Sequence, residues 1–348
     1  MNYHYQTSEC MPRQYPVVVF RGVLNLGETS DTRIIHRGNF MRGEWGDATA
    51  PTIIDDSSFP LPDGISLLWG AITERKAYSL EAPLNKDRIE ELWQQQDNEG
   101  APLYEFIVVG IAPYGGVAVW LRGTHKSTLL KWLKGVEIDE TVVKQYLMGY
   151  SLRYYCHLSI EQNEVVKTNL QAHGLPAPDL YDRWMQQYHY RYVVLEEYYD
   201  GKSWQRYDDA DLYYDDMEVD SVEDCRFDGT HDRLRDGGLM TQHVAGCPKR
   251  IIVKWQEGWT SFSAYYWLDE NAAPQAFHRF FMINAADRAD LLMRIDTRAN
   301  HYGIALKSSE LQTIQELGDE VYQLIVFRND HEYFRSKNYH QEKDAWNW

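Results

Sequence analysis

The chain has 348 residues, which suits two domains better than one and leaves ample length for buried cores. Its 12 tryptophans and 25 tyrosines favour β-rich folds and contact surfaces. Its formal net charge of −17 disfavours nucleic acid and anionic membranes as partners and favours a basic macromolecule.

The sequence also predicts a soluble, cytoplasmic protein. Its four cysteines show no disulfide-framework spacing, which indicates reduced thiols. The N-terminus lacks the basic and apolar regions of a signal peptide, and Cys10 follows polar residues unlike those of a lipoprotein cleavage site. The longest uncharged run, Phe106 to Leu121, is too short to span a membrane and contains proline and glycine.

One β-rich pattern occurs twice along the chain. Proline, isoleucine, an aliphatic residue and tryptophan recur at the same spacings, at Pro62, Ile65, Leu67 and Trp69 and again at Pro248, Ile251, Val253 and Trp255. Further matches follow after a single one-residue insertion: Ala77-Tyr78 with Ala264-Tyr265, Trp93 with Phe280, and Gly116–Val119 with Gly303–Leu306. A repeat of this length predicts two similar lobes.

In the first lobe, the patterns predict strands at Tyr15–Phe20, Ile65–Trp69 and Lys76–Leu80, followed by a helix that Asn85 caps. Strands at Leu103–Ile111 and Gly116–Leu121 follow, then a short helix at Thr124–Lys134 that Gly135 closes.

A helical connector is predicted next, with a capping box at Ser159–Gln162, a helix end at Gly174 and a third helix over Leu180–Tyr188. The second lobe begins with a strand at Tyr190, which we match to Tyr15. It repeats the element order, with a hairpin turn at Glu257-Gly258, a helix from Pro274, and a last helix that Ser309–Gln312 caps and Gly318 ends.

These patterns predict an α+β, β-rich fold with two repeated antiparallel-sheet lobes and short helices, joined by a helical connector. The expected boundaries are 1–138 for the first lobe, 139–189 for the connector and 190–328 for the second lobe. Residues 329–348 are charged and aromatic without a clear period, and we expect them to form a tail that is ordered only by docking.

The most unusual segment is Glu196–Asp232, in the second copy. It contains fourteen Asp or Glu residues and three Lys or Arg residues, a net charge of −11. Tyrosines and tryptophan are interleaved with its carboxylates, and this composition is typical of an interface that anchors and steers a basic partner. The predicted partner-binding residues are Trp204, Tyr207, Asp208, Asp209, Asp211, Tyr213, Tyr214, Asp215, Asp216, Glu218, Asp220, Glu223 and Asp224. The alternative is an acidic loop that only keeps the protein soluble.

Catalytic and metal-binding interpretations have less support. Asp228–Asp232 is too short for a calcium loop, and the spacing of Cys225, His231, His243 and Cys247 fits no familiar zinc site. No nucleophile or phosphate-binding motif is present. Carboxylate pairs such as Asp208/Asp209 and Asp215/Asp216 leave a hydrolase open as the alternative function. We expect no catalytic residues, cofactor or metal.

The stretch from Trp69 and Tyr78 through Val109–Gly123 resembles an uncharacterised family of bacterial proteins known mainly by a domain-of-unknown-function label. Its members commonly show a Trp/Tyr hairpin followed by Gly-x-x-Pro-x-Gly-Gly-Val-x-Val-Trp-x-x-Gly, which this chain matches from Gly110 to Gly123. The resemblance covers roughly residues 60 to 125. In the second copy Asn300–Gly303 and Lys307 replace the family's residues, and the lipoprotein signal of many members is lacking.

Members of this family often lie beside secreted antibacterial toxins and look like immunity proteins. The resemblance therefore implies a cytoplasmic immunity protein that blocks a basic toxin domain, such as an ADP-ribosyltransferase or nuclease delivered by a contact-dependent or type VI system. A structural adaptor within a secretion locus is a third possibility.

Overall fold

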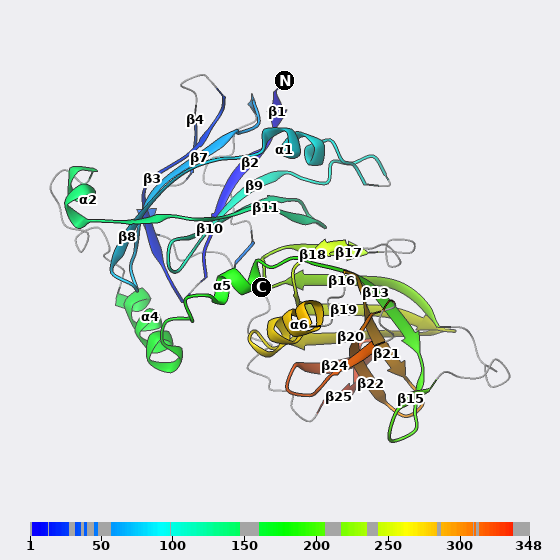
Figure 1. Ribbon diagram of the computed structural model, residues 1–348. Coiled ribbons are helices and arrows are strands. Elements are labelled where there is room, and N and C mark those ends of the chain that lie inside the picture. The colour runs from blue at the N-terminus through cyan, green and yellow to red at the C-terminus, as the bar shows by residue number, and fades with distance from the viewer. Residues whose placement is uncertain are drawn as a thin grey trace. The chain divides into compact units, whose positions relative to one another are not determined.

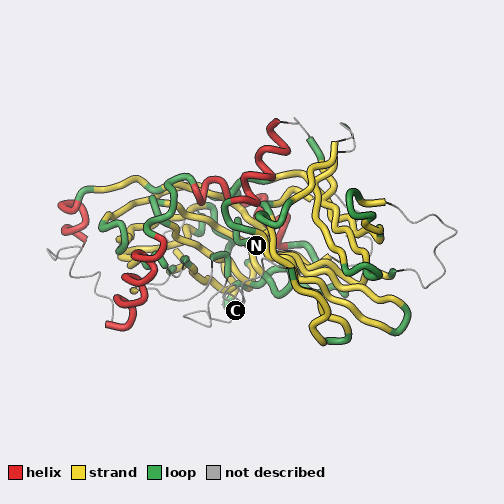
Figure 2. Tube along the Cα trace, turned by 90° about the horizontal axis from the view of Figure 1, so that it is seen from below, coloured by secondary structure: helices red, strands yellow, loops and turns green. Residues whose placement is uncertain are grey.

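The computed structural model describes residues 2–336 apart from 13, 28–31, 36–37, 40–44, 48–56, 98, 147–159, 206–216, 235–242, 284–286, 309 and 311–312. Strands dominate the fold and the helices are few and short, as Figures 1 and 2 show. The prediction of a β-rich α+β fold is confirmed. Two compact units are present: Met1–Asp182 with Asp228–Thr230, and Arg183–Phe227 with His231–Trp348.

The described chain contains many short strands and five helices. Three helices lie in the first unit, one crosses the boundary and one lies in the second unit. The strands of the first unit are β1 (Tyr3–His4), β2 (Gln6–Cys10), β3 (Val17–Asn25), β4 (Thr32–Ile34), β5 (Gly38–Asn39), β6 (Ser58–Phe59), β7 (Gly64–Ala71), β8 (Lys76–Pro83), β9 (Phe106–Ala112), β10 (Gly116–Arg122), β11 (Ser127–Lys134) and β12 (Val136–Ile138). Its helices are α1 (Lys86–Trp93), α2 (Glu140–Tyr146) and α4 (Ile160–His173), and α5 (Leu180–Trp184) crosses the boundary into the second unit.

The first unit contains two larger sheets and a two-stranded one. One has the order β11-β10-β9-β2, and the other has the order β12-β8-β7-β3-β4 with β5 also on β3. β2 runs parallel to β9, and the other pairs in these sheets are antiparallel. Alternate residues of β9, Ile107, Val109 and Ile111, join the same core as Ile65 and Trp69 of β7. The two sheets therefore enclose one core between them.

Helix α1 agrees with the sequence prediction. The Asn85 side chain accepts a hydrogen bond of 3.1 Å from the Arg88 backbone N–H, so Asn85 is the N-cap. Ile89 and Leu92 on one face of the helix are buried in the first core. The helix then packs on the sheets through the apolar face that the sequence spacing predicted.

The helix predicted over Thr124–Lys134 is wrong, because these residues form the edge strand β11. They pair with β10 from Gly116↔Lys134 to Arg122↔Ser127. The leucines and tryptophan of this segment fit a helical period as well as a strand, and pairing with β10 decides for the strand. Gly135 does not end a helix but leaves room for Trp69, whose Cη2 would lie 2.3 Å from a Cβ at that position.

Residues 139–189, the predicted connector, contain α2, α4 and α5. The predicted end at Gly174 is confirmed: α4 stops at His173 and Gly174 takes φ +68. α5 is shorter than the predicted Leu180–Tyr188 helix, and the chain has already entered a strand by Tyr188.

The second unit is also built mainly from strands. They are β13 (Tyr188–Glu196), β14 (Tyr198–Tyr199), β15 (Trp204–Gln205), β16 (Glu218–Arg226), β17 (His231–Leu234), β18 (His243–Ala245), β19 (Pro248–Glu257), β20 (Thr260–Leu268), β21 (Ala289–Asp296), β22 (His301–Ser308), β23 (Thr313–Leu317), β24 (Tyr322–Arg328) and β25 (His331–Arg335). Its helix α6 is Ala272–Ile283.

Two larger sheets form the second unit, with orders β18-β13-β21-β22-β23 and β17-β16-β19-β20-β24-β25. The last predicted helix is wrong, because the residues from Thr313 to Leu317 form β23 and pair with β22. In the stretch predicted as a tail, β25 pairs with β24 and extends the sheet as far as Arg335.

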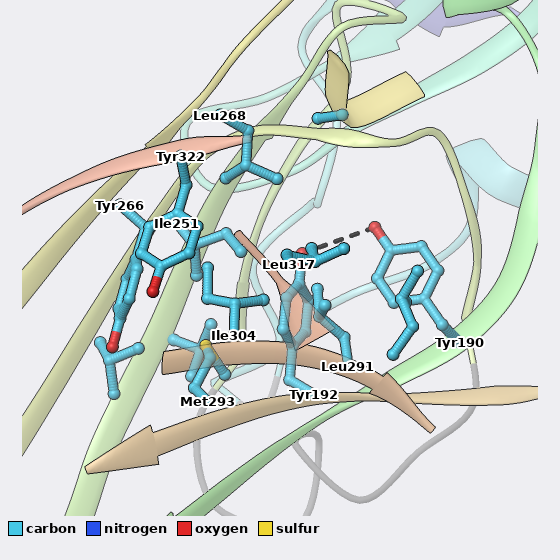
Figure 3. Packing of buried hydrophobic residues seen from close by; sticks show 14 of the residues in the cluster. Tyr190, Tyr192, Ile251, Tyr266, Leu268, Leu291, Met293, Ile304, Leu317 and Tyr322 are labelled. Carbon is cyan, nitrogen blue, oxygen red and sulfur yellow. Dashed lines mark hydrogen bonds between the residues drawn. The ribbon is translucent and has the colours of Figure 1, made fainter. Parts of the chain in front are cut away.

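Aromatic and aliphatic side chains from both sheets and from α6 share the core of the second unit. Figure 3 shows Tyr190 and Tyr192 of β13 beside Leu291 and Ile304 of the same sheet. Phe277 and Phe280 of α6 are fully buried in this core, on the helix that the sequence predicted from Pro274 and that begins at Ala272.

The strand orders of the two units correspond. β2 lies parallel to β9 in the first unit and β13 lies parallel to β21 in the second, and each parallel pair is followed by two antiparallel strands. The other sheets contain β3-β7-β8-β12 and β16-β19-β20-β24, each in chain order. α1 and α6 join the sheets at corresponding points of the two orders.

The strand pairings differ from two of the matches made from sequence. Trp69 stacks on its cross-strand partner Tyr78 with ring centroids 5.6 Å apart, and Trp255 stacks on its cross-strand partner Phe262 at 5.1 Å. The residue opposite Trp255 is Phe262 and not Tyr265, because the turn after β19 is two residues shorter than the turn after β7. Tyr190 lies on β13, which runs parallel to β21 as β2 runs parallel to β9, whereas Tyr15 precedes β3.

Candidate functional site

The acidic segment Glu196–Asp232 is described only in part. Trp204, Glu218, Asp220, Glu223 and Asp224 are described. The remaining predicted partner-binding residues lie outside the described residues: Tyr207, Asp208, Asp209, Asp211, Tyr213, Tyr214, Asp215 and Asp216.

Trp204 packs against its own unit. Its ring centroid lies 5.5 Å from that of Tyr199 and 5.1 Å from that of His301. A Cβ at Gly303 of β22 would stand 2.9 Å from the Trp204 ring, so the indole lies close against the strand backbone. The guanidinium carbon of Arg294 lies 5.8 Å from the same ring. Trp204 therefore fixes the short β14–β15 hairpin to the sheet and keeps part of its ring accessible.

Buried charges surround this hairpin. Arg294 is 5 % exposed, its Nε lies 3.1 Å from Glu197 Oε2, and it also bonds Glu316. Asp296 is 2 % exposed and accepts hydrogen bonds of 2.9 Å from the backbone N–H groups of Tyr199 and Ala299. These contacts compensate the buried charges, so the cluster holds the hairpin and the β21–β22 turn in place.

His301 stacks on Tyr199 with ring centroids 4.0 Å apart and an interplanar angle of 11°. Burial lowers the pKa of His301, and the nearby carboxylates of Asp296 and Asp319 oppose that shift. The imidazole therefore favours its neutral form, which suits stacking on a phenol ring.

Asp224 lies in the interior of the second unit, whereas a partner-binding residue was expected at the surface. Its carboxylate accepts hydrogen bonds from Arg226 Nε at 2.8 Å, from the Asp232 backbone N–H at 2.9 Å, and from the Tyr192 hydroxyl. Burial raises the pKa of Asp224 to about 6, and the Arg226 charge opposes this rise. The Tyr190 hydroxyl extends the network to the Gly246 carbonyl at 2.8 Å.

Glu223 points to the other face of β16 and is only part-buried. Its Oε1 lies 3.1 Å from Lys254 Nζ and 3.2 Å from Arg233 Nε, on the two neighbouring strands. Ion pairs of this exposure stabilise by about 1 kcal/mol or less. Glu223 is therefore committed to pairs within the sheet.

Glu218 and Asp220 are exposed at the beginning of β16. Glu218 pairs with Gln256 of β19, and Asp220 lies at a bulge where the register shifts between Val219 and Ser221. Of the five described residues of the predicted site, these two are the exposed ones.

One exposed residue near this site was missed in the sequence analysis. Trp259 is 103 % exposed and lies in the two-residue turn between β19 and β20. The predicted turn at Glu257-Gly258 already implied this exposure, because the residue after Gly258 in so short a turn cannot reach the core.

Among the residues that the structure describes, no group of three or more His, Cys, Asp or Glu side chains is arranged to hold a metal ion. Cys225 and His231 are cross-strand partners on β16 and β17, and the Arg250 side chain approaches Cys225 Sγ at 3.4 Å.

The family-like motif of the first unit forms a glycine–tryptophan packing arrangement. A Cβ at Gly110 would lie 2.5 Å from the Trp120 ring, and one at Gly116 would lie 2.3 Å from Trp132. Gly115 takes φ +75 in the β9–β10 turn, where only glycine is unstrained. Trp120 is fully buried and its Nε1–H donates to the Asp228 carbonyl at 2.9 Å. The motif therefore builds the fold of the unit and carries no exposed chemical group.

Comparisons with known proteins identify the family to which the chain belongs. No curated protein and no solved structure matches the chain. In the part of the chain that the structure describes, no helix is both long and apolar enough to cross a membrane. The model of a family described as "Protein of unknown function (DUF2931)" matches residues 1–211. This match covers more than half of the chain and includes the glycine–tryptophan motif, so the chain belongs to the DUF2931 family.

Proposed function

We propose that this protein is an immunity protein that binds a cognate antibacterial toxin domain and blocks it by steric occlusion. The observation that carries the proposal is the uneven charge: Glu196–Asp232 has a net charge of −11 in a chain of net charge −17. The described part of that segment presents Glu218 and Asp220 to solvent. Such a surface attracts basic domains and repels acidic ones.

The expected target is the toxin domain of a polymorphic effector of the type VI or Rhs-like kind, such as an ADP-ribosyltransferase or nuclease. Domains that act on NAD or nucleic acid bind anionic substrates and often have basic clefts, which an acidic surface can fill. In this proposal the protein acts in the cytoplasm, without a cofactor and without catalysing a reaction.

The described carboxylates give no specific support to the hydrolase alternative. Asp224 is enclosed by Arg226 and Tyr192, and Glu223 is paired with Lys254 and Arg233. Both carboxylates are engaged by neighbouring side chains of the same unit.

We also propose that the two units derive from one duplicated unit, with the acidic segment added to the second copy. Their corresponding strand orders support this proposal, as do the stacked pairs Trp69–Tyr78 on β7 and β8 and Trp255–Phe262 on β19 and β20. In that history the scaffold is shared and the second copy carries the recognition surface.

The test is to mix the purified protein with the toxin domain encoded by the adjacent gene. We expect a complex at nanomolar to low micromolar concentrations by isothermal titration calorimetry, together with loss of the toxin's enzymatic activity. Absence of a complex at micromolar concentrations would sink the proposal.

A further inference from the structure

Three turns and strand ends meet at one end of the six-stranded sheet of the second unit. Glu218 begins β16 opposite Gln256, and Gln256 itself pairs with Ser261 across the β19–β20 hairpin. The β24–β25 turn joins this end, because the Asn329 side chain accepts a hydrogen bond of 3.0 Å from the Ser261 backbone N–H. We call these residues, with Trp259, the Trp259 end of the sheet.

Trp259 is unlike the other described tryptophans. Ten of the 12 tryptophans are described, and the other nine are buried or part-buried, whereas Trp259 is fully exposed. Gly258 takes φ +59 at the first position of the two-residue turn, so the turn carries Trp259 beyond the last strand pair, Glu257↔Thr260. The fold gains nothing from an indole at that place, where a polar residue would be well solvated.

The surroundings of Trp259 are acidic. Exposed carboxylates at this end are Glu218, Asp220 and Asp330. Arg328 is also exposed at this end, and its guanidinium carbon lies 5.9 Å from the Phe262 ring and 5.6 Å from the Tyr333 ring, so its single charge offsets only part of the charge of the three carboxylates. In the sequence, the Asp-rich stretch runs directly into Glu218. A flat aromatic face bordered by carboxylates suits a lysine or arginine side chain, which the ring attracts through cation–π contact and the carboxylates pair with.

We propose that Trp259 is the anchor of the partner surface and that it packs against a lysine or arginine of a basic protein partner. This inference rests on the proposed function and adds to it a residue and a contact chemistry. Interface energy concentrates in a few aromatic and arginine residues, while surrounding carboxylates mainly speed association. A second copy of this chain and an anionic membrane are disfavoured occupants, because each would bring negative charge to an acidic surface.

The first arm of the test uses the purified toxin domain of the adjacent gene and two variants, Trp259→Ala and Met282→Ala. Met282 is the matched control, because it is 68 % exposed in the same unit but lies on α6. We expect Trp259→Ala to weaken binding by about 30-fold, as removal of a tryptophan hot spot does, and Met282→Ala to change it by less than about twofold. Both variants should keep the wild-type melting temperature, since neither side chain is buried.

The second arm does not depend on the toxin. A photo-crosslinking phenylalanine analogue is placed at position 259 or at position 282 in cells of the native host, and crosslinked proteins are identified by mass spectrometry. We expect crosslinking at 259 to a basic protein whose purified form binds the wild type and binds Trp259→Ala more weakly.

The outcomes separate the two proposals. If the toxin binds the wild type and Trp259→Ala equally, the anchor is overturned and the immunity function stands. If the toxin does not bind but another basic protein satisfies the second arm, the anchor stands and the immunity function fails. Crosslinking to a second copy, or no more at 259 than at 282, overturns the anchor.

Discussion

The indole of Trp120 lies so close to the Cα of Gly110 that a single methyl group there would meet its ring at 2.5 Å. Neither partner can yield easily, because Trp120 is fully buried, contacts Trp45 edge-to-face at 5.0 Å and donates a hydrogen bond to Asp228. The most recognisable glycine of the family motif is thus half of a packing contact.

Gly110→Ala should therefore destabilise the protein. Overpacking of a rigid buried site costs about 1–3 kcal/mol, which urea denaturation followed by tryptophan fluorescence would measure. Gly318→Ala is the control, because the group it would meet is the flexible side chain of Glu320. Combining Gly110→Ala with Trp120→Phe should recover part of the loss. Equal stability of the two alanine variants would contradict a packing role for Gly110.

Arg226→Met should destabilise the protein by about 3–5 kcal/mol at pH 8, because it leaves the buried Asp224 carboxylate without its cation. The deficit relative to wild type should shrink at pH 5. Burial already raises the pKa of Asp224 to about 6, and Arg226 holds it from rising further. Without Arg226 the folded variant takes up a proton at pH 5 that the unfolded chain, with a pKa of about 3.9, does not bind, so its stability rises as pH falls.

Urea denaturation at pH 5 and pH 8 checks this pH dependence. Arg233→Met provides the control, since Arg233 forms a part-exposed pair with Glu223 on the neighbouring strand. Its cost should stay within about 1 kcal/mol at both pH values. A deficit of Arg226→Met that is the same at pH 5 and pH 8 would show that Arg226 does not keep Asp224 ionised.

The paired change Glu218→Lys/Asp220→Lys should slow association with the toxin domain by about tenfold at low salt and leave the dissociation rate nearly unchanged. Exposed carboxylates act mainly on the encounter, and salt screens that action. Stopped-flow or biolayer measurements at 20 mM and 300 mM salt would report it, and the difference from wild type should narrow at the higher salt concentration.

A control with the same charge change is available at the other end of the β20–β24 ladder. Glu270 and Glu320 are exposed, and they lie near the Leu268↔Tyr322 pair rather than the Phe262↔Arg328 pair. If Glu270→Lys/Glu320→Lys slows association as much as the first pair, net charge rather than the position of Glu218 and Asp220 sets the rate.

Asn85→Ala should lower stability by about 1 kcal/mol, because the Arg88 backbone N–H loses its side-chain acceptor at the start of α1. Asn85→Asp or Asn85→Ser should retain most of the stability, since each offers a replacement oxygen. Thermal denaturation of the three variants tests the cap, and an unchanged melting temperature for Asn85→Ala would count against it.

Sequence reasoning located the parts of this fold that depend on local pattern. The Trp69 and Trp255 strands and the Asn85 cap follow from spacing or from a residue's own hydrogen-bonding capacity. Sequence reasoning matched Tyr78 to Tyr265 by residue identity, whereas Phe262 lies opposite Trp255 because strand register depends on turn length. Leu129 to Leu133 fitted two periods, and only the presence of β10 as a partner selects the strand.

The candidate site was less predictable for a related reason. Asp224 and Glu218 belong to the same acidic run, yet one is buried beside Arg226 and the other is exposed. The two residues are six apart on β16, so alternation alone would place them on one face, and the bulge at Asp220 places them on opposite faces. Tyr192, which lies 32 residues from Asp224 in sequence, then bonds the buried carboxylate. Trp259 was overlooked because a search for repeated core residues passes over a residue whose distinguishing property is that it lies outside the core.

The parallel strand pair at the beginning of each unit determines how late in synthesis that unit can complete its sheets. Gln6 of β2 pairs with Phe106 of β9, and Tyr190 of β13 pairs with Ala289 of β21. About 100 further residues must therefore be synthesised before the first strand of each parallel pair can form that pairing. During translation the edge of each first strand that faces its parallel partner remains unpaired for that interval, and long-range pairing of this kind is slow. A ribosome-bound chain stopped before residue 106 therefore carries β2 without β9, and one stopped before residue 289 carries a β13 that has β18 but not β21 to pair with.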